Sequence, residues 1–273
     1  MIITCTEIAK HWLAELAKTI SSESLTPRLG IVQVGSAEAA TRFIKKKREA
    51  ADKLGIQVQH KQFAPNLTTS ALQQQVTALA KQVDGLIVQL PLPSSLQTRA
   101  ILDAVPPAKD IDGLGAAQLA ALVRNEHGFV PATVRGILYF LESYKIPLAG
   151  TRIAIVGLGQ LVGRPLALAL ANRGATLLLA DKQEKQLTAL LSSAEVVVSA
   201  TGVPGTLTGK HVHKNLLVLD AGFSIKNGKI VGDVETDTVA AAGARVTPVP
   251  GGLGALTVAA LFANLLDALH AKA

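Results

Sequence analysis

Cysteine and aromatic residues are scarce in this chain. Cys5 is the single cysteine among 273 residues, so neither an internal disulfide nor a zinc site built from several cysteines can form. Aromatic residues make up 3% and do not interleave with basic ones, as they do in platforms that stack single strands. We expect no metal and no nucleic-acid partner. Because the net charge is +7, a nucleic-acid module stays the alternative of a different class, which salt-dependent binding would reveal.

Long apolar runs are also absent. Gly, Pro or charged residues break every apolar stretch before the roughly 18 to 20 residues that a membrane-spanning helix needs. Glu7, Lys10, His11 and Glu15 interrupt the start, which therefore does not read as a secretory signal peptide. We expect a soluble, cytoplasmic protein with no membrane partner.

Apolar strand-like runs alternate with amphipathic stretches from end to end. This alternation is typical of parallel sheets covered by helices, so the predicted fold class is α/β. In the first half, the spacing predicts strands at residues 29–34, 56–60 and 85–90 and helices at residues 38–54 and 69–81.

A proline-rich break at residues 91–107 separates this series from a second one. There we expect a helix at residues 133–144 and strands at residues 152–156, 175–180, 195–200 and 216–220. The domain change is placed near residue 140. We predict a first domain at residues 1–139, a Rossmann-like dinucleotide-binding domain at residues 140–254, and a C-terminal helix at residues 255–273 that packs back on the first domain.

A glycine turn follows the first strand of the second series. Gly157, Leu158, Gly159 and Gly163 stand between an apolar strand and a helix start. Glycines let the backbone approach a pyrophosphate, and the free amides of the helix start supply donors. We predict a dinucleotide site, with a ligand-free tight turn as the alternative because the spacing is G-x-G-x-x-x-G.

Residues after the next two strands extend this site. Asp181 ends the second strand about 20 residues beyond the turn, where a carboxylate accepts bonds from a ribose 2′-hydroxyl and repels a 2′-phosphate. NAD is therefore favoured over NADP, although Lys182 and Lys185 lie close enough in sequence to neutralise a phosphate. Thr201 and Gly202, after the third strand, are expected to line the nicotinamide side; an ordinary strand-end loop is the alternative.

Several further segments share their pattern with one family. They are Phe43-x-x-x-Lys47 before Gly55-Ile56, Val88-Gln89-Leu90-Pro91-Leu92-Pro93, Lys109-Asp110-Ile111-Asp112-Gly113, Val231-Gly232-Asp233-Val234, and residues 247–259 with Pro250-Gly251-Gly252. In this order, over nearly the whole chain, they resemble the bifunctional methylenetetrahydrofolate dehydrogenase/methenyltetrahydrofolate cyclohydrolase family.

The resemblance implies an enzyme with two activities. It would oxidise 5,10-methylenetetrahydrofolate with NAD or NADP and hydrolyse the methenyl product to 10-formyltetrahydrofolate. The resemblance also implies a homodimer. By resemblance, Lys47, Gln89 and Asp112 are the catalytic candidates, and Phe43, Pro250, Gly251 and Gly252 join Gln89 and Asp112 in binding the folate.

The chemistry expected of Lys47 can be stated from the residues. Phe43 and Lys47 are four residues apart and share a helix face, so a ring can rest on the folate while the amine reaches the one-carbon centre. A lysine with a pKa of about 10.4 must lose roughly 3 units to act as a base near neutrality. We expect burial and the neighbouring Lys45, Lys46 and Arg48 to lower it.

Departures from the family pattern leave alternatives open. Phe43 replaces a tyrosine, Leu158-Gly159 replaces Arg-Ser, and the F-H-P-x-N segment after Gly113 is missing. In the family, the Arg-Ser pair contacts the 2′-phosphate of NADP. The alternatives are a degenerate paralogue that binds nucleotide or folate without one or both activities, and an unrelated Rossmann oxidoreductase acting on a small hydroxy or keto acid.

Overall fold

The computed structural model describes residues 1–226 and 228–271. Residues 272 and 273, which belong to the predicted C-terminal helix, lie outside the described residues. The helices are α1 (Thr6–Ser22), α2 (Glu38–Lys53), α3 (Thr69–Ala80), α4 (Thr98–Leu102), α5 (Ala116–Arg124), α6 (Ala132–Ser143), α7 (Gly163–Ala171), α8 (Leu187–Leu191), α9 (Thr236–Ala241) and α10 (Gly254–His270). The strands are β1 (Arg28–Val34), β2 (Gln57–Phe63), β3 (Gly85–Val88), β4 (Arg152–Val156), β5 (Thr176–Ala180), β6 (Val196–Ser199), β7 (Leu217–Asp220), β8 (Ser224–Lys226), β9 (Lys229–Val231) and β10 (Arg245–Val246).

The chain divides into two compact units. The three-stranded unit comprises His11–Ala132 and Val258–Ala273, and the five-stranded unit comprises Met1–Lys10 and Thr133–Thr257. Both are α/β, which confirms the predicted fold class. The predicted boundary between folate and dinucleotide domains, near residue 140, stays a prediction.

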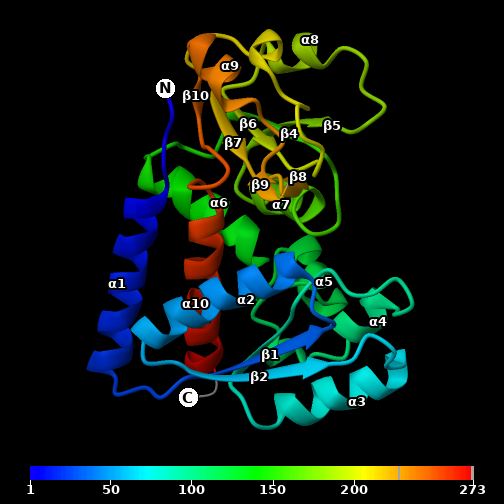
Figure 1. Ribbon diagram of the computed structural model, residues 1–273. Helices are drawn as coiled ribbons and strands as arrows, with labels where there is room; N and C mark the ends of the chain where they lie inside the picture. Colours follow the sequence, from blue (N-terminus) through cyan, green and yellow to red (C-terminus); the bar gives the residue numbers. More distant parts are fainter. Residues whose placement is uncertain (227, 272–273) are drawn as a thin grey trace. The chain divides into compact units, whose positions relative to one another are not determined.

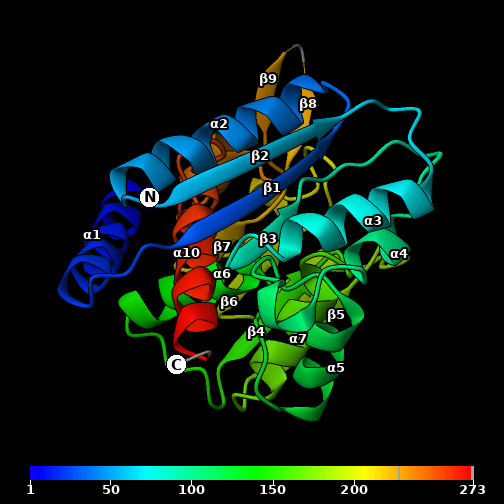
Figure 2. The same ribbon diagram turned by 90° about the horizontal axis from the view of Figure 1, so that it is seen from below.

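The three-stranded unit contains a parallel sheet of order β2-β1-β3. In both views α2 and α3 lie on opposite sides of these strands (Figures 1 and 2). Apolar residues of β1, β3, α3 and α4 form one buried cluster, in which Val32, Leu72 and Leu86 are fully buried. Strand β3 ends at Val88, two residues earlier than expected, because Pro91 beyond it has no amide hydrogen for a ladder bond.

The C-terminal helix belongs to the three-stranded unit from Val258 onward, as predicted. Helices α1 and α10 lie side by side in both figures, and His270 Nε2 lies 2.7 Å from Oε2 of Glu23. Helix α10 begins at Gly254, one residue before the predicted start at residue 255. Within the described ranges, no helix is long and apolar enough to cross a bilayer.

The five-stranded unit contains a parallel sheet of order β10-β7-β6-β4-β5. Chain order reverses between β4 and β6, since β5 lies on one side of β4 and the later strands lie on the other. Such a reversal is the switch point at which open α/β sheets bind ligands, beyond the carboxyl ends of the strands. Strands β4, β6 and β7 are buried, and their apolar runs explain why the sequence predicts them within one residue at each end.

Candidate active site

Lys47 and Gln89 meet in the three-stranded unit. Lys47 lies in the third turn of α2, and Gln89 follows the last residue of β3. The ammonium Nζ of Lys47 donates a hydrogen bond to Oε1 of Gln89 over 3.1 Å, and both side chains are buried. Gln89 also donates from Nε2 to the carbonyl oxygen of Leu90 over 2.7 Å. Its amide is therefore oriented with the oxygen toward Lys47.

The electrostatics of Lys47 favour loss of its proton. Burial lowers the pKa of Lys47, and the negative charge of Asp112 acts in the opposite direction. Burial likewise raises the pKa of Asp112, and Lys47 opposes that rise. The exposed Lys45, Lys46 and Arg48, expected to help lower the pKa of Lys47, are not its cause; burial is.

Phe43 lies one helical turn before Lys47 on α2. Its side chain is partly exposed, whereas Ile44 beside it is buried in the core. A ring at this position can cover a flat ligand, because residues four apart share a helix face. The structure thus brings together Phe43, Lys47, Gln89 and Asp112 in a single compact unit.

The glycine turn lies at the switch point of the five-stranded sheet. Gly157 has a φ of +96°, and a Cβ atom there would stand 2.6 Å from the carbonyl oxygen of Ala200, at the end of β6. At Gly163 a Cβ would meet the oxygen of Gly157 at 1.9 Å, so helix α7 approaches the turn too closely for any side chain. A Cβ at Gly159, by contrast, would have no protein atom within 4 Å. The turn therefore has the shape that a dinucleotide pyrophosphate needs.

Leu158 and Gly159 form the tip of this turn. Arg164 holds them, because its Nε donates to the carbonyl oxygen of Leu158 over 2.9 Å and its backbone nitrogen donates to that of Gly159. Asp181 directly follows β5, and the turn is tied to that strand end by a bond from the Gly157 nitrogen to the Ala180 oxygen. Asp181 and Lys182 are exposed, and the Lys182 nitrogen donates to Oδ1 of Asp181.

Thr201 and Gly202 lie beyond the end of β6. The backbone nitrogen of Thr201 donates to Oδ2 of Asp233 over 2.6 Å, and the hydroxyl of Ser199 donates to the same oxygen. Asp233 is fully buried, and its Oδ1 has no hydrogen-bond partner among the residues that the structure describes. Asp220, at the end of β7, accepts the backbone nitrogens of Gly222, Asp233 and Val234. Two buried carboxylates thus order the strand ends around the predicted nicotinamide loop.

Pro250, Gly251 and Gly252 precede α10 in the five-stranded unit. Gly251 has a φ of +101°, and its carbonyl oxygen accepts a bond from the Cys5 nitrogen. At Gly252 a Cβ would stand 2.4 Å from the Pro248 oxygen. These three residues belong to a different compact unit from Lys47, so their predicted contact with folate stays a prediction.

Sequence reasoning gave no role to several residues that organise these sites. Asp220 and Arg164 are examples, and so is Asn264 on α10. Asn264 is 1% exposed, yet it interrupts the apolar run of helix α10, and a polar residue at such a position is the signal that could have identified it.

A parallel sheet with a glycine turn at its switch point, joined to a second α/β unit, defines a dinucleotide-binding α/β protein of the Rossmann class. Two family models match the chain: the catalytic domain of tetrahydrofolate dehydrogenase/cyclohydrolase over residues 3–112, and the NAD(P)-binding domain of the same family over residues 131–273. The chain belongs to the tetrahydrofolate dehydrogenase/cyclohydrolase family of bifunctional enzymes. The family joins an oxidoreductase and a hydrolase of one-carbon folate metabolism.

Individual relatives agree over almost the full length. The bifunctional protein FolD of Hydrogenobaculum is 35% identical over 263 residues, which cover 95% of this chain and 94% of that protein. The crystal structure of the bifunctional FolD enzyme of Campylobacter jejuni has a TM-score of 0.93 at 29% identity and covers 100% of this chain and 99% of its own. The Trypanosoma brucei enzyme, complexed with NADP cofactor and inhibitor, has a TM-score of 0.92 at 28% identity, with 100% and 98% covered.

Proposed function

We propose that this enzyme oxidises 5,10-methylenetetrahydrofolate with NAD as the preferred acceptor and hydrolyses the methenyl product in the three-stranded unit, with Lys47 as the base. The observation that carries the proposal is the buried bond from Lys47 to Gln89, with Asp112 acting on the same amine.

Hydrolysis requires a group that takes a proton from the attacking water. A neutral lysine can do so, and burial favours the neutral form of Lys47. Gln89 holds the amine in place, since its oxygen accepts one of the Nζ hydrogens. As the water oxygen bonds to the methenyl carbon, one water proton passes to Nζ. The C=O bond of the formyl group then forms as one carbon–nitrogen bond breaks, and the released nitrogen keeps the electron pair of that bond and takes the hydroxyl proton.

Asp112 is proposed to bind the amino-pyrimidine end of the folate. That edge presents two donors, which a carboxylate can accept as a pair. Phe43 is proposed to cover the ring system, as its place one turn before Lys47 allows. Pro250, Gly251 and Gly252 are proposed as further folate contacts.

The cofactor proposal rests on the turn of the five-stranded unit. Bound NAD(P) supplies the acceptor for the hydride. Gly157, Gly159 and Gly163 would hold its pyrophosphate, and Thr201 and Gly202 would lie at the nicotinamide.

Preference for NAD over NADP is supported by two local features. Asp181 is tied through Ala180 to the turn, and a carboxylate there favours a 2′-hydroxyl over a 2′-phosphate. Leu158 supplies no cation at the tip of the turn, and the guanidinium of Arg164 is bonded there through Nε to the Leu158 oxygen. Lys182 and Lys185 are the residues to which a phosphate would be assigned if NADP proves the better acceptor.

Two further expectations complete the proposal. We propose a cytoplasmic homodimer that binds neither nucleic acid nor membranes. Strand β5 lies at the edge of its sheet and exposes 45% of Leu179, a feature that suits pairing with a second copy. Sedimentation at micromolar concentration distinguishes a dimer from a monomer.

One assay tests the function itself. Purified protein is mixed with 5,10-methylenetetrahydrofolate and either NAD or NADP, and the reduced cofactor and the methenyl product are followed at their separate absorbances. Reduction of the cofactor followed by decay of the methenyl signal supports both activities. Cofactor binding without any turnover would instead favour a degenerate paralogue.

A further inference from the structure

Asp112 lies in a turn outside the helices and strands. The turn follows a short 3₁₀ helix, Pro107–Lys109, and precedes α5. A side chain in an irregular segment has no ladder or helix bonds to fix its direction. The position of Asp112 relative to Lys47 must therefore come from other contacts.

Asp110 provides the first of these contacts. Its Oδ1 accepts the backbone nitrogens of Gly113 and Leu114 at 3.1 and 3.4 Å, and its Oδ2 accepts that of Gly115 at 2.7 Å. The carboxyl is 5% exposed. One side chain thus closes the chain that follows Asp112 into a fixed loop, because a carboxylate can accept several donors at once.

Asn264 provides the second contact, from α10. Its Nδ2 donates to the carbonyl oxygen of Ile111 at 2.7 Å and to that of Val130 at 3.0 Å. The nitrogen of Ala132, two residues beyond Val130, donates to the carbonyl oxygen of Asp112. Asn264 therefore links Ile111, the residue before Asp112, to residues 130–132, which also bond to the Asp112 carbonyl oxygen.

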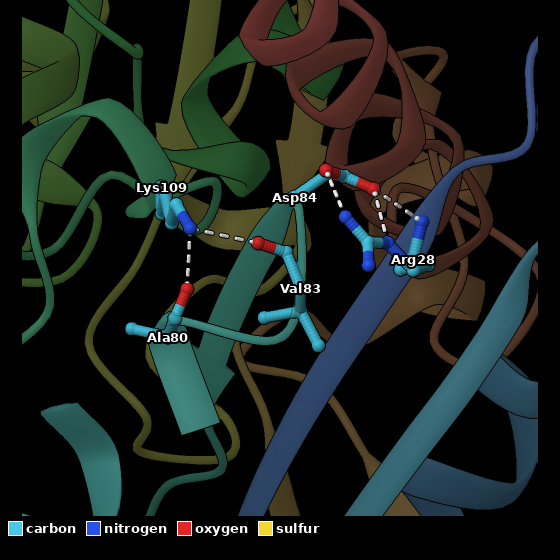
Figure 3. Close-up of polar contacts among 5 residues, drawn as sticks. All are labelled: Arg28, Ala80, Val83, Asp84 and Lys109. Atoms are coloured by element: carbon cyan, nitrogen blue, oxygen red, sulfur yellow. Dashed lines mark hydrogen bonds and ion pairs between the residues drawn. The ribbon is translucent and has the colours of Figure 1, made fainter. Parts of the chain in front are cut away.

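Lys109 anchors the start of the same turn. As Figure 3 shows, its ammonium donates to the carbonyl oxygens of Ala80 and Val83, at the end of α3. Beside them, Arg28 and Asp84 form an ion pair. In residues 109–112, the side chains of Lys109 and Asp110 and the carbonyl oxygen of Ile111 all form hydrogen bonds with neighbouring segments.

We propose that Asp110 and Asn264 are positioning residues of the cyclohydrolase site, which hold Asp112 where it binds the folate and acts on Lys47. This inference rests on the proposed roles of Lys47 and Asp112. It assigns to the C-terminal helix a part in catalysis that does not require contact between α10 and the substrate.

Gln118 offers a matched control. Its buried amide also joins the same two segments, since Nε2 donates to the Pro107 oxygen at 2.6 Å and Oε1 accepts the Phe129 nitrogen at 2.8 Å. The bond from Gln118 reaches Pro107, five residues before Asp112, whereas the bond from Asn264 reaches Ile111, directly beside it. Loss of Gln118 and loss of Asn264 should therefore cost similar stability, but only loss of Asn264 should release Asp112.

The charged groups that face this site define a second readout. Asp112 is the charge that acts on Lys47, while Lys45, Lys46 and Arg48 on α2 are exposed. Asp112 interacts electrostatically with Lys47 and Asp110. The Oδ1 atom of Asp103 accepts a hydrogen bond from the Ala116 nitrogen. Because Asp112 raises the pKa of Lys47, displacing it should move the Lys47 limb of the rate profile to lower pH.

The experiment compares full-length Asn264→Leu, Asp110→Asn and Gln118→Leu with the wild type. We measure the KM for 5,10-methenyltetrahydrofolate, the pH midpoint of hydrolysis, and amide hydrogen exchange at residues 113–115. For Asn264→Leu and Asp110→Asn we expect KM to rise by about 2-fold to 12-fold, which is the factor for one lost hydrogen bond. We expect the pH midpoint of hydrolysis to fall in both variants. Gln118→Leu should leave both near the wild type.

Equal changes in Gln118→Leu and Asn264→Leu, or none in Asn264→Leu and Asp110→Asn, would overturn the inference. Should Asn264→Leu fail to fold, Asp110→Asn carries the test, with faster exchange at residues 113–115 as the expected result. Asp112→Asn separates the two levels of the argument. If it alters KM while the anchor variants do not, only this inference fails; if it alters nothing, the proposed role of Asp112 fails as well.

Discussion

The ammonium of Lys47 donates to the side-chain oxygen of Gln89 over 3.1 Å, across 42 residues of sequence. The pair joins helix α2 to the end of β3, an edge strand of the three-stranded parallel sheet. Since the Gln89 amide is fixed by Leu90, its oxygen can serve only as an acceptor for the amine. In this bond Lys47 has a neutral partner, which favours the charged amine less than a bonded carboxylate would; the charge of Asp112 acts on Lys47 in addition.

Phe43→Tyr should increase hydrolysis of the methenyl compound selectively. Phe43 can cover a ring but offers no hydrogen bond, whereas a tyrosine hydroxyl would give Lys47 a further partner. A neutral bond contributes roughly 0.5 to 1.5 kcal/mol, which corresponds to a gain of about 2-fold to 12-fold. Both activities are assayed on the same preparation. Equal changes in the two, or none, would show that Phe43 only packs.

Leu158→Arg combined with Gly159→Ser should shift preference toward NADP. The serine fits, because a Cβ at Gly159 meets no protein atom within 4 Å. A charge-assisted bond to the 2′-phosphate contributes about 1.5 to 3 kcal/mol, so the ratio of kcat/KM for NADP over NAD should rise about 12-fold to 150-fold. Leu161→Arg, at an exposed position nearby, is the control and should change the ratio little.

Asp233→Ala should weaken NAD binding while leaving hydrolysis in the other unit intact. The substitution removes the acceptor for the Thr201 nitrogen and the Ser199 hydroxyl. Titration of NAD in the absence of folate should show a dissociation constant several times that of the wild type. Asp237→Ala, an exposed acid on α9, serves as the control. Unchanged NAD binding in Asp233→Ala would remove the Thr201 loop from the cofactor site.

The free energy of unfolding should depend on pH through the titration of Asp220. Burial raises the pKa of Asp220 from its ordinary 3.8 to about 6, so the folded state binds this proton more tightly than the unfolded state. The contribution of Asp220 to stability is therefore fully present below about pH 4 and falls as the pH rises to about 6. The difference amounts to about 3 kcal/mol.

Asp220→Asn removes this titration. Denaturant unfolding at a series of pH values between 4 and 6 should show a decline in the free energy of unfolding that is larger in the wild type than in the variant. Parallel profiles for the two proteins would contradict the raised pKa of Asp220.

Much of the fold could be predicted because several of its strands, such as β3, β4, β6 and β7, are buried and apolar. Strand β4 begins and ends at the predicted residues, and α2 ends one residue before the prediction. Helix α1 and the short pair β8 and β9 were not predicted, although apolar residues recur at helical spacing in α1 and the sequence between β8 and β9 contains Asn-Gly. Chain order alone could not show that Met1–Lys10 belongs to the five-stranded unit.

The sequence indicates which residues form the candidate site, but not which contacts hold them in place. Lys47, Gln89 and Asp112 stand in recognisable motifs, whereas Asn264 acts from 153 residues away through a bond to the Ile111 oxygen. Bonds to backbone carbonyls depend on where the chain passes rather than on which residues it contains. A polar residue within an apolar helix can mark Asn264 as a candidate, but it cannot show which carbonyl oxygens its side chain bonds.

The most direct test of the account is the fate of the methenyl intermediate in Lys47→Met, with Lys46→Met as an exposed control on the same helix. Each variant is mixed with 5,10-methylenetetrahydrofolate and NAD, and methenyltetrahydrofolate and NADH are recorded together. We predict that Lys47→Met still reduces NAD and accumulates the methenyl compound, while Lys46→Met and the wild type consume it. Consumption of the methenyl compound by Lys47→Met at the wild-type rate would contradict the assignment of hydrolysis to Lys47.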